Sequence, residues 1–199
     1  MSVLLLVFLL LCYLSGAVPF GFLLTRRSTG LNILEHGSGN TGSTNVGRIA
    51  GKVVAFRVQI LDMLKGLIPV AILLLLKTRG LLEMPDYYIF LAAFSTIVGH
   101  NFSVFLGGKG GKGVNTSLGS TLLLAPLEVV FAVVIYFVVK SLFKFVSAGS
   151  LALAVTLPVS SILLHGKSIV TLYLLLVCLM IFIRHRSNIA RLLSGKEKL

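Results

Sequence analysis

The 199-residue sequence has no tryptophan and few charged side chains, which make up 12% of its residues. Soluble domains carry about 25% charged residues, so this shortage, together with a hydrophobic content of 56%, excludes an ordinary soluble domain. Without tryptophan the usual interfacial anchors are missing, and the five tyrosines can supply only part of that role. Acidic residues are also scarce, since six Asp and Glu stand against eighteen Lys and Arg. The sequence therefore predicts an integral membrane protein with a basic balance.

Metal and cysteine chemistry also find little support in the sequence. The two cysteines, Cys12 and Cys178, lie in apolar runs and predict buried packing residues, not a disulfide or a metal site. Asp62 and Asp86 are the two aspartates, which excludes the Asp-rich metal motif of CDP-alcohol phosphatidyltransferases and the His-x-x-x-x-Asp pair of acyl-CoA-dependent acyltransferases. A Gly-x-Ser-x-Gly nucleophile elbow is missing too. We therefore expect neither a metal nor a cofactor.

The net charge of +12 has three possible explanations. Nucleic-acid binding is disfavoured, because the basic residues are scattered among apolar runs and do not gather on a soluble domain. The positive-inside rule explains many of them, since Lys and Arg accumulate in cytoplasmic loops. Binding of a phosphorylated substrate explains the cations that are embedded among glycines.

Long apolar runs predict an all-α integral membrane protein that forms a single domain over residues 1–199. Pro19 is expected to kink the first span. Pro126 is expected to divide Val114–Phe145, which is too long for one untilted span, into two short crossings. The total is about seven transmembrane helices, with the N-terminus outside and the C-terminus cytoplasmic. The predicted spans are Val3–Leu24, Val53–Leu76, Tyr87–Leu106, the two parts of Val114–Phe145, Ser147–Leu164 and Ile169–Ile183.

The first Gly-rich, cationic stretch is Gly37–Arg48, inside a polar loop predicted over Thr25–Lys52. Its Gly-x-Gly-x-x-Gly spacing matches the dinucleotide fingerprint, but that motif has meaning inside a βαβ unit, and here membrane spans flank it. A flexible surface loop would explain the glycines alone. The polar groups that accompany them at the start of a helix favour a site for an anion or a polyol. They belong to Ser38, Asn40, Ser43, Thr44, Asn45 and Arg48.

The second such stretch, Gly107–Gly113, is not a Walker A loop, because Val114 stands where that motif needs Ser or Thr after Gly-Lys. A flexible loop whose lysines only fix topology is one interpretation. Topology needs no run of glycines, so we favour a cradle in which backbone N–H groups and lysines bind phosphate. Its candidate residues are Gly107, Gly108, Lys109, Gly110, Gly111, Lys112, Gly113 and Thr116.

A third cationic stretch, Arg184–Arg191, follows the last apolar run. His185 and Asn188 are three residues apart, so they would share a helix face. Inside the second span, Asp62 and Lys65 lie one helical turn apart. Charges at membrane depth are costly and usually pair or line a polar cavity, so a structural ion pair and a catalytic role both stay open.

These segments together resemble the bacterial glycerol-3-phosphate acyltransferases that use acyl phosphate, the PlsY type. The matches follow the family's order along the chain, and the length and span content agree. Asn32 and Leu34 depart from the family's usual Asp and Arg, Ser103 from its Pro and Asn115 from its Ala. The matching segments are Ser15–Gly21, Gly37–Asn45, Asp62–Pro69, Gly99–His100, Lys109–Thr116 and Arg184–Leu192.

The resemblance implies phospholipid synthesis at the bacterial inner membrane, with the active site facing the cytoplasm. A fatty acyl group would pass from acyl phosphate to the sn-1 hydroxyl of glycerol 3-phosphate, giving lysophosphatidic acid and inorganic phosphate. Acyl phosphate is assigned to the second stretch. Glycerol 3-phosphate is assigned to the polar residues of the first stretch together with His185 and Asn188, and the catalytic candidates are His185, Lys112 and Ser43.

Two questions stay open at this stage. The general base is either His185 or the donor's own phosphate, and the shortage of carboxylates in the inside loops favours the phosphate slightly. A membrane carrier for a phosphorylated solute is the alternative function, although the sequence shows neither paired repeats nor a polar path to the outside.

Overall fold

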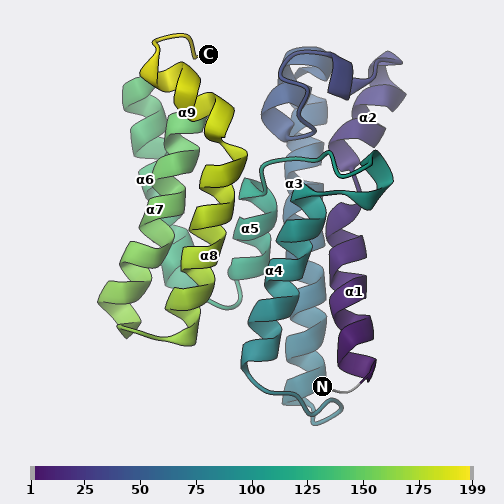
Figure 1. The fold of residues 1–199 in the computed structure, drawn as a ribbon, viewed down its shortest axis with the longest axis vertical. Coiled ribbons are helices and arrows are strands. Elements are labelled where there is room, and N and C mark those ends of the chain that lie inside the picture. The colour runs from purple at the N-terminus through teal and green to yellow at the C-terminus, as the bar shows by residue number, and fades with distance from the viewer. Residues whose placement is uncertain (1–2, 198–199) are drawn as a thin grey trace. The chain divides into compact units, whose positions relative to one another are not determined.

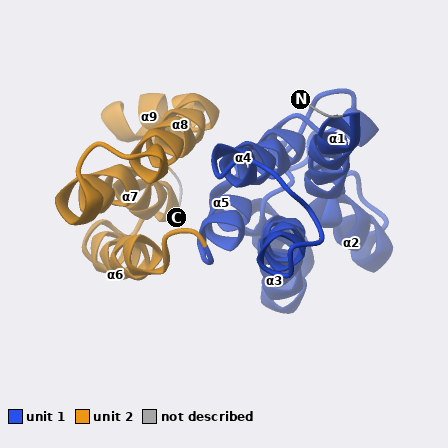
Figure 2. Ribbon diagram, turned by 90° about the horizontal axis from the view of Figure 1, so that it is seen from below, with its two compact units in different colours: residues 1–123 blue, residues 124–199 orange. Residues whose placement is uncertain are grey.

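The computed structural model describes residues 3–197, and every regular element in that range is a helix. The chain divides between Leu123 and Leu124 into two compact units, which Figure 2 colours separately. Unit 1 contains α1 to α5 and unit 2 contains α6 to α9, as labelled in Figure 1. The all-α fold class is confirmed, whereas the single domain over residues 1–199 stays a prediction.

Unit 1 opens with α1 (Val3–Ala17) and α2 (Phe20–Thr29), which are separated at Val18–Pro19. Proline lacks an N–H and its ring clashes with the preceding turn, so the helix does not continue through it. The kink predicted at Pro19 is confirmed. A 3-10 turn, η1 (Ile33–Glu35), follows α2.

The next helix, α3 (Ser43–Thr78), is 36 residues long and bends at Gly51, whose φ of 84° and ψ of 168° are not helical. Glycine adopts such a conformation without a steric penalty. The bend brings Gly47 next to Ala55, although eight residues of straight helix would separate them by about 12 Å. The first two turns of α3 therefore fold back against the rest of the helix.

The predicted limits of the polar loop need correction. We expected Thr25–Lys52 to be irregular, but α2 continues to Thr29 and α3 begins at Ser43. The reason is that α2, η1 and the start of α3 each carry apolar side chains, which pack together with the rest of α3 in a small hydrophobic cluster. The cluster consists of Ile33, Val46 and Val58, all completely buried, with Phe22, Leu24 and Ile49 packed around them.

Unit 1 is completed by α4 (Tyr87–Asn101), η2 (Val104–Leu106) and α5 (Val114–Thr121). Helix α1 packs on α4, and α3 packs on α5. Glycines lie at both contacts: a Cβ at Gly16 would overlap the main chain of Thr96, and a Cβ at Gly66 would overlap that of Thr116. Small residues let membrane helices approach closely, so these glycines fix where α4 and α5 lie in unit 1.

Unit 2 consists of α6 (Pro126–Phe143), α7 (Val146–His165), α8 (Ile169–Arg184) and α9 (Arg186–Leu193). Helix α7 packs against both α6 and α8. The chain turns by 63° between α8 and α9, at His185. Near one end of the unit, the buried carboxylate of Glu128 pairs with Nε2 of His165 at 2.9 Å.

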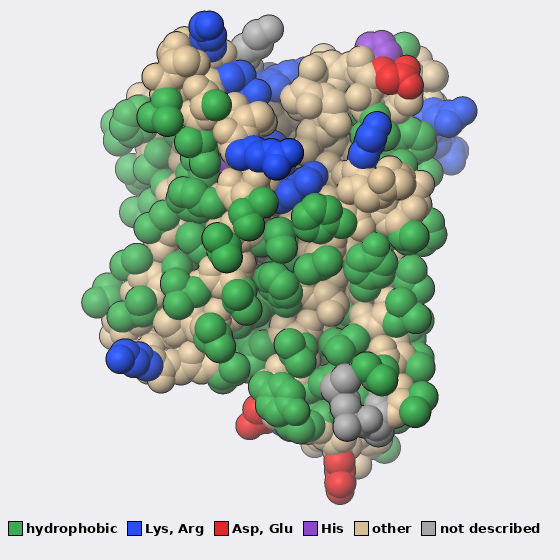
Figure 3. All heavy atoms as spheres, in the orientation of Figure 1, with side chains coloured by type: hydrophobic (Ala, Val, Ile, Leu, Met, Phe, Trp, Pro, Cys, Tyr) green, Lys and Arg blue, Asp and Glu red, His purple; other side chains and the backbone are tan. Residues whose placement is uncertain are grey.

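The surface of both units is largely apolar. Leu6 and Leu10 on α1, and Val130, Val134 and Phe137 on α6, are exposed. Figure 3 shows hydrophobic side chains over most of the visible face of each unit, and on unit 1 the Lys and Arg side chains gather toward one end. An exposed apolar surface of this extent suits contact with lipid.

Within residues 3–197, five helical segments are long and apolar enough to cross a membrane, or six if the bent pair α8–α9 is one span. The break predicted near Pro126 is confirmed, because α5 ends at Thr121 and α6 begins at Pro126. The crossing expected before that break is too short: the eight residues of α5 rise about 12 Å, against an apolar core of about 30 Å. The predicted count of about seven spans is therefore not confirmed.

Candidate functional site

The loop between η1 and α3, which we call the first loop (residues 36–42), is shaped by Asn45. This side chain is 2% exposed. Its Oδ1 accepts the N–H of Ser38 at 2.9 Å, and its Nδ2 donates to the carbonyls of His36 and Asn40 at 3.1 and 2.9 Å. Gly37 has a φ of 62°, and a Cβ there would overlap the Asn45 side chain. Asn45, predicted as a substrate ligand, thus has both N–H groups committed to shaping the loop.

The other predicted residues of this region lie around the start of α3. Asn40 reinforces the turn, since its Oδ1 accepts the N–H of Gly42 at 2.8 Å. Ser43 is the first residue of α3, within the segment that was predicted as a loop, and it is half-buried. The side chains that face solvent are Ser38, Thr44 and Arg48.

The loop between η2 and α5, which we call the second loop (residues 107–113), has two distinct halves. Gly107, Gly108 and Lys109 are exposed. In the other half Gly110, Gly111 and Gly113 are buried, and Lys112 between them is half-buried. The N–H of Gly111 donates to the carbonyl of His100 at 3.0 Å, which ties the buried half to the end of α4. Of the two lysines in the loop, Lys112 is therefore the one surrounded by buried main chain, and Lys109 is exposed.

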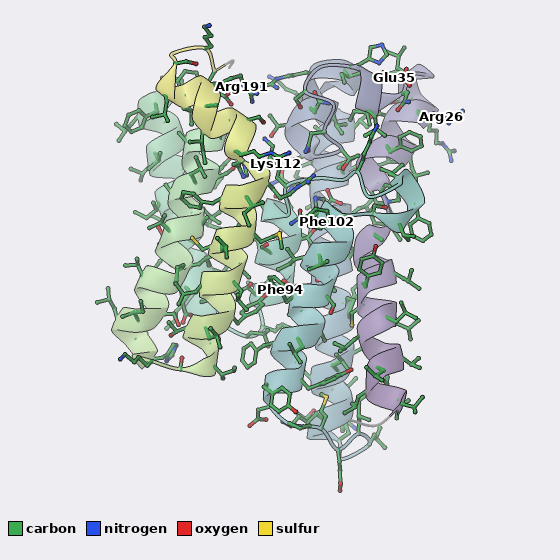
Figure 4. All side chains as sticks on the ribbon, in the orientation of Figure 1. Arg26, Glu35, Phe94, Phe102, Lys112 and Arg191 are labelled. Atoms are coloured by element: carbon green, nitrogen blue, oxygen red, sulfur yellow. The ribbon has the colours of Figure 1, made fainter. Side chains whose placement is uncertain are left out.

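The two loops lie against each other in unit 1. Nδ2 of Asn40 donates to the carbonyl of Gly110 at 3.3 Å. Nδ2 of Asn115, in the first turn of α5, donates to Oγ of Ser43 at 3.3 Å. Figure 4 shows Lys112 on the α4–α5 connection, toward the end of unit 1 that carries Arg26 and Glu35. Two stretches that are far apart in the sequence, each predicted to bind an anion, are thus neighbours.

Thr116, the last candidate of the second stretch, lies inside unit 1 and not at its surface. Its side chain is completely buried, and its carbonyl lies against Gly66 of α3. This position suits packing between α5 and α3, and a contact with substrate stays a prediction.

Below the second loop, Asp62 and Lys65 form a buried ion pair. Oδ1 of Asp62 and Nζ of Lys65 are 2.9 Å apart, and the two side chains are 3% and 4% exposed. Nδ1 of His100 lies 3.6 Å from the same Asp62 oxygen. The ion pair that the one-turn spacing allowed is present, and it has a third member on α4.

In unit 2, His185 and Asn188 lie at the junction of α8 and α9 and are 2% and 6% exposed. Nδ1 of His185 is 2.8 Å from the carbonyl of Ile181. A carbonyl can only accept, so Nδ1 carries the proton, and a neutral ring then presents Nε2 as its basic nitrogen. Asn188 lies in α9, whereas His185 lies at the bend before it, so the shared helix face stays a prediction.

Glu197 was not among the predicted site residues, yet it contacts one of them. One carboxylate oxygen accepts hydrogen bonds from Asn188 Nδ2 at 2.6 Å and Ser147 Oγ at 2.8 Å, and the other accepts from Arg191 Nε at 2.7 Å. Burial alone would raise the pKa of Glu197, but these three hydrogen bonds and the charge of Arg191 outweigh burial and lower it. The C-terminal segment thus holds Asn188 in place through an ionised carboxylate. In the sequence, the one indication of this contact was an acidic residue six positions after Arg191.

No group of three or more His, Cys, Asp and Glu side chains suited to a metal ion occurs in the described part of the chain. What the geometry offers is backbone N–H groups, amides, hydroxyls and cations. Such groups bind and neutralise anions.

Comparison with known proteins places this arrangement in a family. A sequence model described as glycerol-3-phosphate acyltransferase matches residues 6–195. The chain belongs to the glycerol-3-phosphate acyltransferase family. Members from Clostridium acetobutylicum and Solidesulfovibrio magneticus are 38% and 41% identical to it over 187 and 191 residues. The aligned parts cover 94% of this chain and 94% of the first relative, and 96% of this chain and 92% of the second. The predicted family is confirmed.

Two solved structures share the fold. Both are of PlsY, described as an integral membrane glycerol 3-phosphate acyltransferase, in a glycerol 3-phosphate form and a lysophosphatidic acid form. Their TM-scores are 0.88 and 0.85 at 31% and 30% sequence identity, and each match covers 98% of this chain and 94% of the other. The chain is thus a multi-pass integral membrane protein of this fold.

Three of the four positions that the sequence analysis named as departures from the family make hydrogen bonds. Asn32 donates to Glu35, and Ser103 Oγ donates to the carbonyl of Ala17 at 2.6 Å. The third is Asn115, which contacts Ser43. These three residues therefore make local polar contacts inside unit 1.

Proposed function

We propose that this protein transfers a fatty acyl group from acyl phosphate to the sn-1 hydroxyl of glycerol 3-phosphate. The hydroxyl oxygen attacks the acyl carbonyl carbon and forms the new ester bond. The bond between that carbon and the phosphate oxygen breaks, and the hydroxyl proton ends on the released phosphate. Lysophosphatidic acid and inorganic phosphate are the products, which makes the reaction a step of phospholipid synthesis.

The observation that carries this proposal is the contact between the two loops in unit 1. The reaction brings together two anionic substrates, which repel each other in solution. The Asn40–Gly110 and Asn115–Ser43 hydrogen bonds hold two N–H-rich, cationic segments side by side. Acyl phosphate is already activated, so much of the acceleration comes from neutralising charge and orienting one hydroxyl toward one carbonyl.

For the donor, we assign the phosphate of acyl phosphate to the second loop. Lys112 is its main cation, because it stands in the buried half, and Lys109 adds charge from the exposed half. The N–H groups of Gly107–Gly113 complete the cradle, with Thr116 behind it. Hydrogen bonds to charged groups contribute about 1.5–3 kcal/mol each, so a few of them bind a phosphate firmly.

For the acceptor, we follow the family resemblance and assign glycerol 3-phosphate to the polar residues of the first stretch and to His185 and Asn188. Ser43 and Arg48 are the main first-stretch ligands, and Asn45 also shapes the loop that presents them. His185 and Asn188 bind the acceptor, and the donor's phosphate takes the proton from the hydroxyl. The full set is Ser38, Asn40, Ser43, Thr44, Asn45, Arg48, His185 and Asn188.

We place the reaction at the cytoplasmic face of the bacterial inner membrane, with the N-terminus outside and the C-terminus inside. The cations support this, because Lys109 and Lys112 of the second loop and Arg48, close after the first loop, belong to segments that lie together in unit 1. The acyl chain would extend along the apolar helices into lipid.

The experiment is an assay of the purified protein in detergent with acyl phosphate and glycerol 3-phosphate. We expect phosphate release that requires the acceptor, and a product acylated at the sn-1 position by NMR. Replacing acyl phosphate with acyl-CoA should abolish turnover. Equal turnover with acyl-CoA would overturn the donor assignment. Glycerol 3-phosphate uptake into proteoliposomes without any acyl transfer would favour the carrier instead.

A further inference from the structure

We propose that Asp62 and His100 position the backbone of the second loop, so that Asp62 acts on the donor phosphate through His100 without touching it. The link to the donor rests on the proposed function, in which this loop binds acyl phosphate. The positioning itself concerns unit 1 alone and can be tested without substrate.

The first step is the contact between His100 and the loop. A Cβ at Gly111 would overlap the His100 ring at Nε2, so the imidazole lies directly against this glycine. The main chain of His100 touches the same residue, since its carbonyl accepts the Gly111 N–H at 3.0 Å. Gly110 is packed equally closely, because a Cβ there would overlap the carbonyls of His100 and Asn101. A shift of His100 therefore shifts Gly110 and Gly111, and Lys112 with them.

The second step is the contact between His100 and Asp62. Nδ1 of the ring lies 3.6 Å from Oδ1 of Asp62, and the two side chains are 6% and 3% exposed. That distance is longer than a hydrogen bond but short enough for a strong electrostatic interaction between buried groups. Because Nδ1 faces the carboxylate, the opposite ring nitrogen, Nε2, faces Gly111. Asp62 thereby orients the ring that supports the loop.

The third step is the anchor of Asp62. Nζ of Lys65 is 2.9 Å from its carboxylate and also donates to the carbonyl of Val18 at 2.8 Å. Val18 lies at the break between α1 and α2, where the helix ladder is interrupted. Lys65 thus neutralises the Asp62 carboxylate and also donates a hydrogen bond to a backbone carbonyl at the helix break. This places the carboxylate at a fixed point relative to α1 and α3.

A purely stabilising ion pair would explain the burial but not the geometry. Buried ion pairs are weak contributors to stability, because desolvation offsets the attraction between the charges. Here the Asp62 carboxylate also faces the His100 ring, which packs against the main chain of Gly111 in the second loop. The two explanations predict different effects of an isosteric change at Asp62. A stabilising ion pair predicts lower overall stability and an equal rise in KM for both substrates. A positioning role predicts a less protected second loop and a rise in KM for acyl phosphate alone.

The test is a double-mutant cycle of Asp62→Asn and His100→Gln, with KM measured separately for the two substrates. Asp62→Asn should raise KM for acyl phosphate roughly ten- to a hundredfold, as expected when a positioned group moves by about 1 Å. KM for glycerol 3-phosphate should change less than about twofold. In the His100→Gln background, Asp62→Asn should add little, because a residue that acts through another is non-additive with it.

A second measurement needs no substrate. Hydrogen exchange of the Gly111 amide, which is bonded to His100, should be about tenfold faster in Asp62→Asn than in the wild type. Asp86→Asn is the matched control, since Asp86 pairs with Lys77 in an exposed ion pair on unit 1 and does not belong to the loop's surroundings. It should leave both KM and exchange unchanged.

The outcomes separate the two proposals. Wild-type exchange at Gly111 in Asp62→Asn, or effects of Asp62 and His100 that simply add, would overturn the positioning role. Faster exchange together with an equal rise in KM for both substrates would assign Asp62 to general stability and would also overturn it. Failure of the wild type to use acyl phosphate would overturn the proposed donor, and exchange would then decide the positioning alone. If His100→Gln does not fold, exchange and the two KM values of Asp62→Asn decide.

Discussion

Removal of Lys112 tests the assignment of the second loop most directly. The Lys112→Ala substitution deletes the cation in the buried half of the loop and leaves the neighbouring glycines unchanged. A hydrogen bond to a charged group contributes about 1.5–3 kcal/mol. At about 1.4 kcal/mol per decade, kcat/KM for acyl phosphate should fall roughly ten- to 150-fold. The assay is the initial rate of phosphate release at several concentrations of acyl phosphate.

Two other lysines make the result specific. Lys109 in the same loop is exposed, so Lys109→Ala should cost at most about 1 kcal/mol, or roughly fivefold, as for other exposed charges. Lys167→Ala removes an exposed charge from the α7–α8 connection and should have no effect on turnover. A folded Lys112→Ala enzyme with near-normal turnover would refute the reasoning, and so would a Lys109→Ala enzyme that is equally impaired.

Further predictions concern unit 2 and the topology. His185→Gln should keep measurable turnover with a raised KM for glycerol 3-phosphate, whereas complete loss of turnover with intact binding of both substrates would make His185 the base. Glu197→Gln should lower the midpoint of thermal unfolding at neutral pH. The pKa of Glu197 is lowered in the folded state, so its contribution is complete above the unfolded value of about 4.3 and is lost as pH falls through the folded-state pKa. The difference between wild type and Glu197→Gln should therefore shrink in acid, and a difference that grows there would contradict the role of the ionised carboxylate. Single cysteines at Ser38, Lys109 and Ser194 should resist an impermeant thiol reagent in intact cells, and labelling of any one from outside would contradict the proposed topology.

The sequence predicted the family, and it singled out the segments of the proposed site for a clear physical reason. Glycines, amides and cations are conspicuous among lipid-like residues, because a membrane span has little use for them. The kink at Pro19 and the break near Pro126 both follow from local chemistry. The sequence was sufficient to predict the structure where a single residue, such as a proline, determines the backbone conformation.

The errors arose where distant contacts decide the structure. The polar composition of Thr25–Lys52 predicted a loop, but buried Val46 and the bend at Gly51 fold its second part into helix. Asn45 was predicted to bind substrate, which stays a prediction, and its role in shaping the loop through three hydrogen bonds was not foreseen. Glu197 was unpredictable because its three donors come from two helices, α7 and α9.

The pair of Asp62 and Lys65 shows the same limit at the site itself. Their spacing predicts an ion pair, yet no spacing rule leads to His100 on α4 or to the Val18 carbonyl. The second loop is thus supported from below by α3 and α4 and from the side by Asn40 of the first loop. In the function that we propose, its N–H groups face the donor phosphate only when all three supports are in place. The affinity for the donor should therefore respond to substitutions elsewhere in unit 1 that never touch the substrate.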